Sequence, residues 1–165
     1  MTALAPKNSK RPFRMVKGIS TIADLDANPV SVTASTVTLS REVHAGRLTV
    51  LNLAAGIAVT LPAATGSGDM YHLAVGIIFT GAASVAANGT DIFVGTAVLF
   101  ADGGATVVGF NTTATSDTID LLGTGNSTGG IAGESIELID MASGTWFVKL
   151  VSDAAGTEAT PFNAP

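Results

Sequence analysis

The feature that most constrains this chain is a period-two alternation of small apolar residues, broken at short intervals by turn residues. It is clearest over residues 44–76, where three apolar runs are separated by Ala54-Ala55-Gly56 and by a Pro- and Gly-containing segment at residues 62–69. β-branched and aliphatic residues on this period indicate strands with one buried face, and no window keeps a helical period. We therefore expect antiparallel β-strands here.

The same pattern recurs along most of the chain. Ten apolar runs can be placed, at residues 30–39, 48–53, 57–61, 71–79, 83–86, 92–99, 106–110, 118–122, 135–140 and 146–151. Turn residues separate them at a spacing of about 8–12 residues, which is typical of a sandwich or jelly roll. The sequence predicts an all-β fold, an antiparallel β-sandwich of jelly-roll-like type.

The clearest hairpin signal lies near the C-terminus. Apolar runs on either side of Met141-Ala142-Ser143-Gly144 are joined by a loop that contains a glycine. Trp146, the one tryptophan of the chain, lies in the second run. The rest of the core must be built largely from small residues, so we expect Trp146 to fill its largest gap as a core anchor.

Charge is distributed unevenly along the chain. Five of the eight basic residues lie close together, at Lys7, Lys10, Arg11, Arg14 and Lys17. Residues 48–148 contain no Lys or Arg, whereas eight acidic residues fall there. A basic segment therefore precedes an acidic body.

These features divide the chain into an extended N-terminal arm at residues 1–35, a β-sandwich body at 36–151 and a short C-terminal tail at 152–165. Pro6, Pro12 and Pro29 interrupt regular structure in the arm. Phe13 and Val16 lie among its basic residues, a mixture suited to a segment that becomes ordered on a partner. The alternative, an arm that packs on the acidic face of its own body, stays open.

The composition also favours a protein with partners. Charged residues make up 13% of the chain, about half of the ~25% that is usual, while hydrophobic residues make up 47%. Such a surface suits a protein that buries much of itself against other chains. A monomer with an uncharged Thr/Ser/Asn surface is the alternative.

Several classes of function lack support. The chain has no cysteine for a disulfide or thiolate site. No apolar run approaches the ~18 residues of a membrane span, and no apolar segment follows the N-terminal basic residues as in a secretory signal. Phosphate-binding glycine motifs are missing. We expect no cofactor, no small-molecule substrate and no membrane partner.

Catalytic and metal-binding patterns are weak as well. Ser67 and Asp69 with His44 or His72 could be drawn as a triad, but the G-x-S-x-G context of a nucleophile elbow does not fit. Asp102, Asp117 and Asp120 lack the surrounding oxygen ligands of a calcium loop. We expect neither an enzyme nor a metal site.

Nucleic acid is also an unfavourable partner. The arm carries cations for phosphate contacts, but Phe13 is its one interleaved aromatic residue. The acidic body would repel a polyanion. We expect the arm to contact an acidic protein surface instead.

Four segments carry a family resemblance: GRLTVLNLAAGIAVTLPAATGSGDMYHLAVG, GTAVLFADGGATVVGF, GGIAGESIELIDMASGTWFVKLV and GTEATPF. Over about residues 40–165 the chain resembles the capsid decoration, or cement, proteins of tailed bacteriophages. The resemblance implies a non-enzymatic virion protein, commonly a homotrimer, on the outer capsid surface. Members of that class lie at or near three-fold and quasi-three-fold positions and hold neighbouring major capsid proteins together. There are no catalytic residues to transfer.

The resulting expectation is a capsid-stabilising protein whose arm residues Lys7, Lys10, Arg11, Phe13, Arg14, Val16 and Lys17 contact the major capsid protein. The alternative is a receptor- or glycan-binding β module of a tail fibre or other virion component, because TLPAATGSG-type segments also resemble such proteins. The number of copies per virion separates the two.

Overall fold

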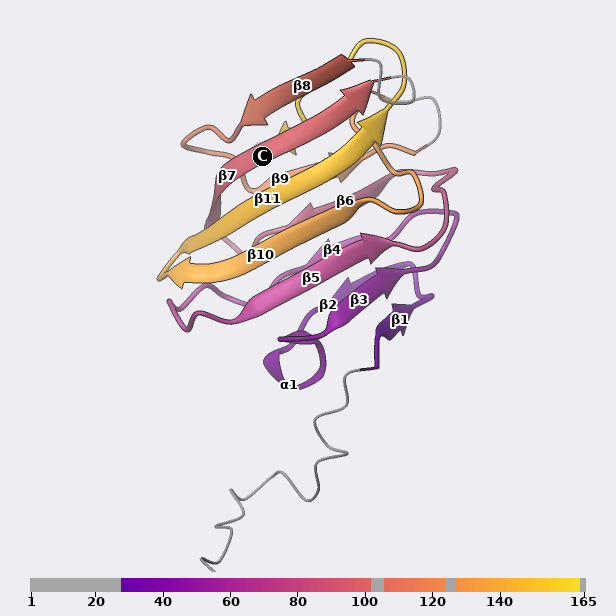
Figure 1. The fold of residues 1–165 in the computed structure, drawn as a ribbon. Coiled ribbons are helices and arrows are strands. Elements are labelled where there is room, and N and C mark those ends of the chain that lie inside the picture. The colour runs from indigo at the N-terminus through magenta and orange to yellow at the C-terminus, as the bar shows by residue number, and fades with distance from the viewer. Residues whose placement is uncertain (1–27, 102–105, 124–126, 164–165) are drawn as a thin grey trace, which may run out of the picture.

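The computed structural model describes residues 28–101, 106–123 and 127–163, which form two β-sheets packed face to face (Figure 1). Across sheet A the strands are β1 (Val30–Val32), β3 (Leu48–Leu51), β5 (Met70–Val75), β10 (Ser135–Ala142), β11 (Thr145–Ala154), β7 (Ile92–Ala101) and β8 (Thr106–Asn111). Across sheet B they are β12 (Phe162–Asn163), β9 (Thr118–Leu121), β6 (Ala83–Ala86), β4 (Ala58–Thr60) and β2 (Thr36–Thr38). The all-β sandwich predicted from the alternation is confirmed.

The first six strands alternate between the two sheets. β1, β3 and β5 are parallel neighbours in sheet A, and β2, β4 and β6 are parallel neighbours in sheet B. Each connection therefore carries the chain across the sandwich instead of reversing it into a hairpin. These strands are parallel, not antiparallel as expected, because alternation reports which face of a strand is buried and not the direction of its neighbour.

The later strands close both sheets with a mixture of pairings. β10 is antiparallel to β5 and to β11, β7 is antiparallel to β8, and β11 runs parallel to β7. In sheet B, β9 is antiparallel to β6 and β12. The predicted hairpin is confirmed as β10–β11, with a register shift between Asp140 and Ala142. Both sheets are mixed, and the jelly-roll-like topology is not confirmed.

The sandwich extends beyond the predicted body at both ends. β1 lies within the segment predicted as an arm, and the single run expected at residues 30–39 divides into β1 and β2, in different sheets. β11 continues to Ala154, and β12 pairs with β9 from within the predicted tail. Phe162 is 6% exposed, so burial of this ring explains why a mostly polar segment joins the fold. A four-residue helix, α1 (Arg41–His44), was not predicted.

The core lies between the sheets and is built from their inward-facing apolar side chains. Trp146 and Tyr71 are its largest members, each 1% exposed. Their ring centroids are 5.6 Å apart at an interplanar angle of 72°, an edge-to-face contact. Trp146 therefore lies in the core position expected of it.

Candidate functional site

The predicted partner-binding residues of the arm lie outside the described ranges. They are Lys7, Lys10, Arg11, Phe13, Arg14, Val16 and Lys17. The described chain begins at Asn28, whose carbonyl oxygen accepts hydrogen bonds from Nη2 (2.8 Å) and Nε (3.1 Å) of Arg47. The described chain therefore begins beside β1, at one edge of sheet A.

The side chains drawn as a triad do not converge. Ser67 Oγ donates a hydrogen bond to Asp140 Oδ2 (2.8 Å), and Asp69 forms an ion pair with Arg41 (3.1 Å). Neither histidine contacts this serine or this aspartate in the described structure. The arrangement therefore places neither histidine beside the Ser67 hydroxyl as a general base.

The two histidines have separate environments. His44 is buried at the end of α1, and its Nδ1 accepts a hydrogen bond from the Ser40 N–H (3.0 Å). Burial lowers the pKa of His44, which matches its role as a neutral acceptor. His72 projects from the outer face of sheet A, with Nε2 3.9 Å from Glu137 Oε1.

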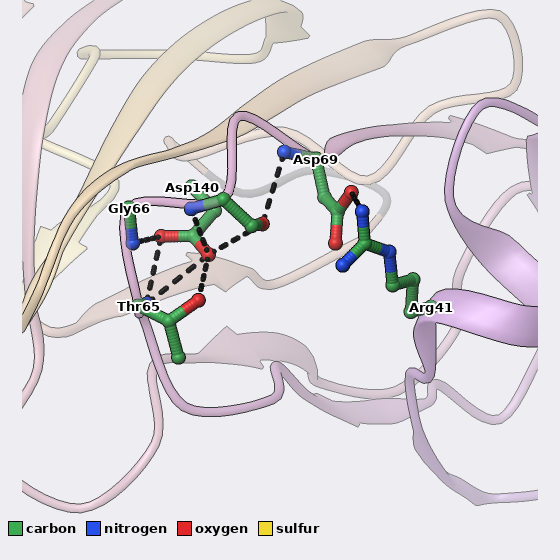
Figure 2. Close-up of polar contacts among 6 residues, drawn as sticks. Arg41, Thr65, Gly66, Asp69 and Asp140 are labelled. Carbon is green, nitrogen blue, oxygen red and sulfur yellow. Dashed lines mark hydrogen bonds and ion pairs between the residues drawn. The ribbon is translucent and has the colours of Figure 1, made fainter.

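The segment around Ser67 instead forms a cradle for the Asp140 carboxylate (Figure 2). Backbone N–H groups of Thr65, Gly66 and Ser67 donate to its oxygens at 2.6–3.1 Å, and the hydroxyls of Thr65 (2.9 Å) and Ser67 (2.8 Å) do the same. Asp140 also donates its own N–H to the Asp69 carbonyl (2.9 Å). The β4–β5 connection is thereby fixed to the end of β10.

The cradle is a structural anion site whose anion comes from the chain itself. Asp140 is 3% exposed, and burial alone would raise the pKa of its carboxyl. The hydrogen bonds from Ser67, Gly66 and Thr65 outweigh burial and hold that pKa well below its usual range. Because the donors are already satisfied by Asp140, this loop offers no ready place for an external anion.

Glu134 is a second buried carboxylate that the sequence analysis missed. Its oxygens accept hydrogen bonds from the N–H groups of Gly130 (2.7 Å) and Asp153 (3.0 Å). Burial raises the pKa of Glu134, in competition with these hydrogen bonds. Gly129 and Gly130 have positive φ and lie where a side chain would collide, so Glu134 fastens a glycine loop to β11.

Neither metal ligands nor membrane helices are found in the part of the chain that the structure describes. Within those ranges no three His, Asp or Glu side chains lie close enough together to hold a metal ion. Asp117 and Asp120 accept hydrogen bonds from Thr118 and Asn163, and Asp102 lies outside the ranges. None of the described helices is long and apolar enough to cross a bilayer.

The most extensive candidate site is the outer face of sheet A, which faces the viewer in Figure 1 with no described segment across it. Strand register sorts its side chains into rows. One row contains Met70, Ile139, Phe147 and Val94, and a second contains Val50, Ala74, Ser135, Val151 and Val98. Met70 is 40% exposed and Val94 44%. The face is therefore largely apolar, which marks interaction surfaces rather than free solvent-facing sheets.

A polar row crosses this apolar face. Leu48, His72, Glu137, Lys149 and Thr96 lie side by side across five strands. A shallow hollow of about 260 Å³ is lined by Leu48, His72, Glu137 and Lys149 together with their neighbours. The row combines both charge signs within an uncharged surround, an arrangement that can set the orientation of a docked protein.

No family model, curated protein or solved structure matches this chain.

Proposed function

We propose that this protein is a non-enzymatic virion structural protein that binds the outside of a phage capsid and stabilises contacts between major capsid proteins. It does so as a homotrimer at three-fold or quasi-three-fold positions. The observation that carries the proposal is the uncovered, largely apolar outer face of sheet A. The sequence resemblance and the low charge of the chain support the same function.

The mechanism needs no covalent chemistry. A protein that binds the assembled shell, and not its dissociated subunits, stabilises the shell by mass action. The apolar rows supply buried area, and the row of His72, Glu137 and Lys149 supplies orientation. Three subunits that engage together would bind with an avidity beyond that of one subunit.

Acidic substitutions on the face test its role in shell binding. Met70→Glu with Val94→Glu is expected to weaken binding to undecorated shells about tenfold or more, because each places a charge in a desolvated apolar row. The matched control is Ile77→Glu with Ile78→Glu, in the β5–β6 connection, where the side chains are 41% and 43% exposed. Equal shell occupancy by the two double variants would contradict the proposal that this face contacts the capsid.

The arm is tested separately. Deletion of residues 2–27 is expected to leave a folded body, because it removes none of the described strands and keeps the contact between Arg47 and Asn28. Shell occupancy should fall sharply.

Substitutions separate the roles of charge and apolar contact in the arm. Changing the five basic residues at 7–17 to Gln should slow association with the shell and weaken the salt dependence of its rate. Phe13→Ser with Val16→Ser should mainly speed release from the shell. Full decoration by the deleted protein would contradict a role for the arm.

Counting copies in purified virions distinguishes decoration from a tail-fibre module. A decoration protein is present in hundreds of copies, and a fibre component in a few to a few tens. Trp146 is unsuited to stack on a sugar because it is buried.

A further inference from the structure

Strand β8 forms an unusually open edge of sheet A (Figure 1). It has six residues, against three in β1, three in β2 and two in β12, the other edge strands of the described structure. Proteins protect such edges with short strands, charges, proline or bulges. β8 has a regular register with β7, and residues 103–116 contain no charged residue and no proline. Nothing in its sequence opposes pairing with another strand.

The register with β7 shows which backbone groups of β8 face outward. The Gly95 carbonyl accepts a hydrogen bond from the Thr112 N–H (3.1 Å), and the Gly95 N–H donates to the Thr112 hydroxyl (3.0 Å), so both backbone groups of Gly95 face the β8 side and this position continues the ladder as a hydrogen-bonded one. Hydrogen-bonded and non-hydrogen-bonded pairs alternate along an antiparallel ladder. Val107, Gly109 and Asn111 therefore turn their N–H and C=O groups away from β7, toward the open edge.

The side chains beside this edge are apolar on both faces of the sheet. On the outer face Val107 is 56% exposed, the largest fraction among the exposed large hydrophobic side chains of the described residues, and its neighbour Phe100 is 38% exposed. Val108 and Phe110 point inward, yet both are only partly buried. A strand added to β8 would cover the outer pair, Val107 and Phe100, and the inner pair, Val108 and Phe110.

We propose that two copies of this chain associate by antiparallel pairing of their β8 strands. One register uses all three outward residues: Gly109 lies opposite Gly109 of the second copy, and Val107 lies opposite Asn111. Each of these pairs exchanges two backbone hydrogen bonds. Phe110 of each copy then lies opposite Val108 of the other, so the partly buried inward side chains cover one another.

The uncharged edge, together with its self-complementary register, favours a second copy as the occupant. Each chain has a net charge of −5, so copies repel one another at most approaches. The described part of this uncharged stretch, residues 106–116, lets two acidic bodies meet without opposed like charges. A basic partner would find no carboxylate there. The inference is independent of the proposed function, because β8 pairing would join two trimers as readily as two monomers.

Charges at Gly109 test the two-fold contact. A Cβ at this position has no neighbour nearer than 4.0 Å, so Gly109→Lys and Gly109→Asp fit the folded chain. Sedimentation of the purified full chain should show that either variant has half the mass of the wild type, with self-affinity reduced about tenfold or more. A one-to-one mixture of the two variants should restore the wild-type mass, because the introduced ammonium and carboxylate groups then meet across the axis. Val43→Lys, in α1 at the far end of sheet A, should sediment as the wild type does.

A second pair of variants tests the register without touching a glycine. Val107→Lys with Asn111→Asp should keep the wild-type mass, because each lysine meets an aspartate of the other copy. Val107→Lys with Asn111→Lys should halve it. The proposal is overturned if the wild type sediments as a 16.5 kDa monomer at high concentration. It is equally overturned if the Gly109 variants keep the wild-type mass, if their mixture does not restore it, or if the two double variants behave alike.

Discussion

Replacing Trp146 with alanine is expected to lower the free energy of unfolding by about 3–5 kcal/mol, the usual cost of removing a large aromatic side chain from a core. Trp146 is 1% exposed and lies on β11, where its indole packs edge-to-face on Tyr71. The surrounding strands belong to two sheets that are fixed by their own ladders, so the cavity can collapse only in part.

Trp146→Phe is the matched control. Trp146 Nε1 is buried without a hydrogen-bond partner among the described residues, and an unsatisfied buried donor costs about 1–3 kcal/mol. Phenylalanine removes this donor while it keeps most of the aromatic contact. We expect it to cost no more than about 1–2 kcal/mol, because the lost packing is offset by the lost desolvation penalty.

Urea unfolding followed by circular dichroism measures all three proteins. In the wild type, the single tryptophan should also give a blue-shifted emission that soluble quenchers reach poorly. A loss below about 1 kcal/mol for Trp146→Ala, or a red-shifted and fully quenched emission, would show that Trp146 is not the core anchor.

The positions of the strands could be predicted because burial on one face leaves a period-two pattern. The β10–β11 hairpin was also predictable, since Gly144, at φ 75°, lies in the loop that joins two apolar runs. Strand direction and sheet membership were not, although residues 30–39 contain a break: their apolar positions change from even numbers (Val30, Val32) to odd numbers (Val37, Leu39) where the chain passes from sheet A to sheet B. Such a change of phase marks the end of one strand, but it does not tell which sheet the next strand joins or in which direction it runs.

The outer face of sheet A did leave a signal in the sequence. In β7, β10 and β11 apolar residues occupy the outward positions as well, at Val98, Ile139 and Phe147. Near-continuous apolar strands are typical of sheets covered on both faces. The low charge of the chain pointed toward partners, but only the register shows that these side chains share one face.

The Asp140 cradle was out of reach for a different reason. Its partners at residues 65–67 are 73–75 positions away, so no local motif connects them. One clue was present: Asp140 shares the inward parity of Ile136 and Leu138, and a carboxylate on a buried face needs dedicated donors. Thr65, Gly66 and Ser67 supply those donors. In the sequence, Ser67 and its neighbouring glycines resembled a fragment of a hydrolase motif instead.

Replacing Asp140 with alanine is expected to cost about 3 kcal/mol or more of unfolding free energy, because three backbone N–H groups lose their acceptor at about 1–3 kcal/mol each, less where water reaches them. Asp140→Asn should be nearly as costly, since its amide NH₂ would face N–H donors. Asp69→Asn is the control. Its ion pair is with Arg41, a side chain 66% exposed, and exposed pairs contribute about 0–1 kcal/mol.

The acid side of the stability curve gives this prediction its second readout. The pKa of Asp140 is lower in the folded protein than in the unfolded chain, where it is near 3.8. The contribution of Asp140 to the free energy of unfolding is therefore complete above the unfolded pKa, and it is lost as the pH falls through the folded pKa. Glu134, whose pKa is raised, acts in the opposite sense: its neutral form is favoured in the fold, so its contribution is lost as the pH rises above about 4.5. The pH ranges in which these two carboxyl groups change the stability of the fold therefore do not overlap. Urea midpoints from about pH 7 to about pH 2 should therefore show the wild type converging on Asp140→Asn only at the acid end. If the two proteins stay separated by a constant amount across that range, the cradle does not act through the charge of Asp140, and the β4–β5 connection must be held by its backbone contacts alone.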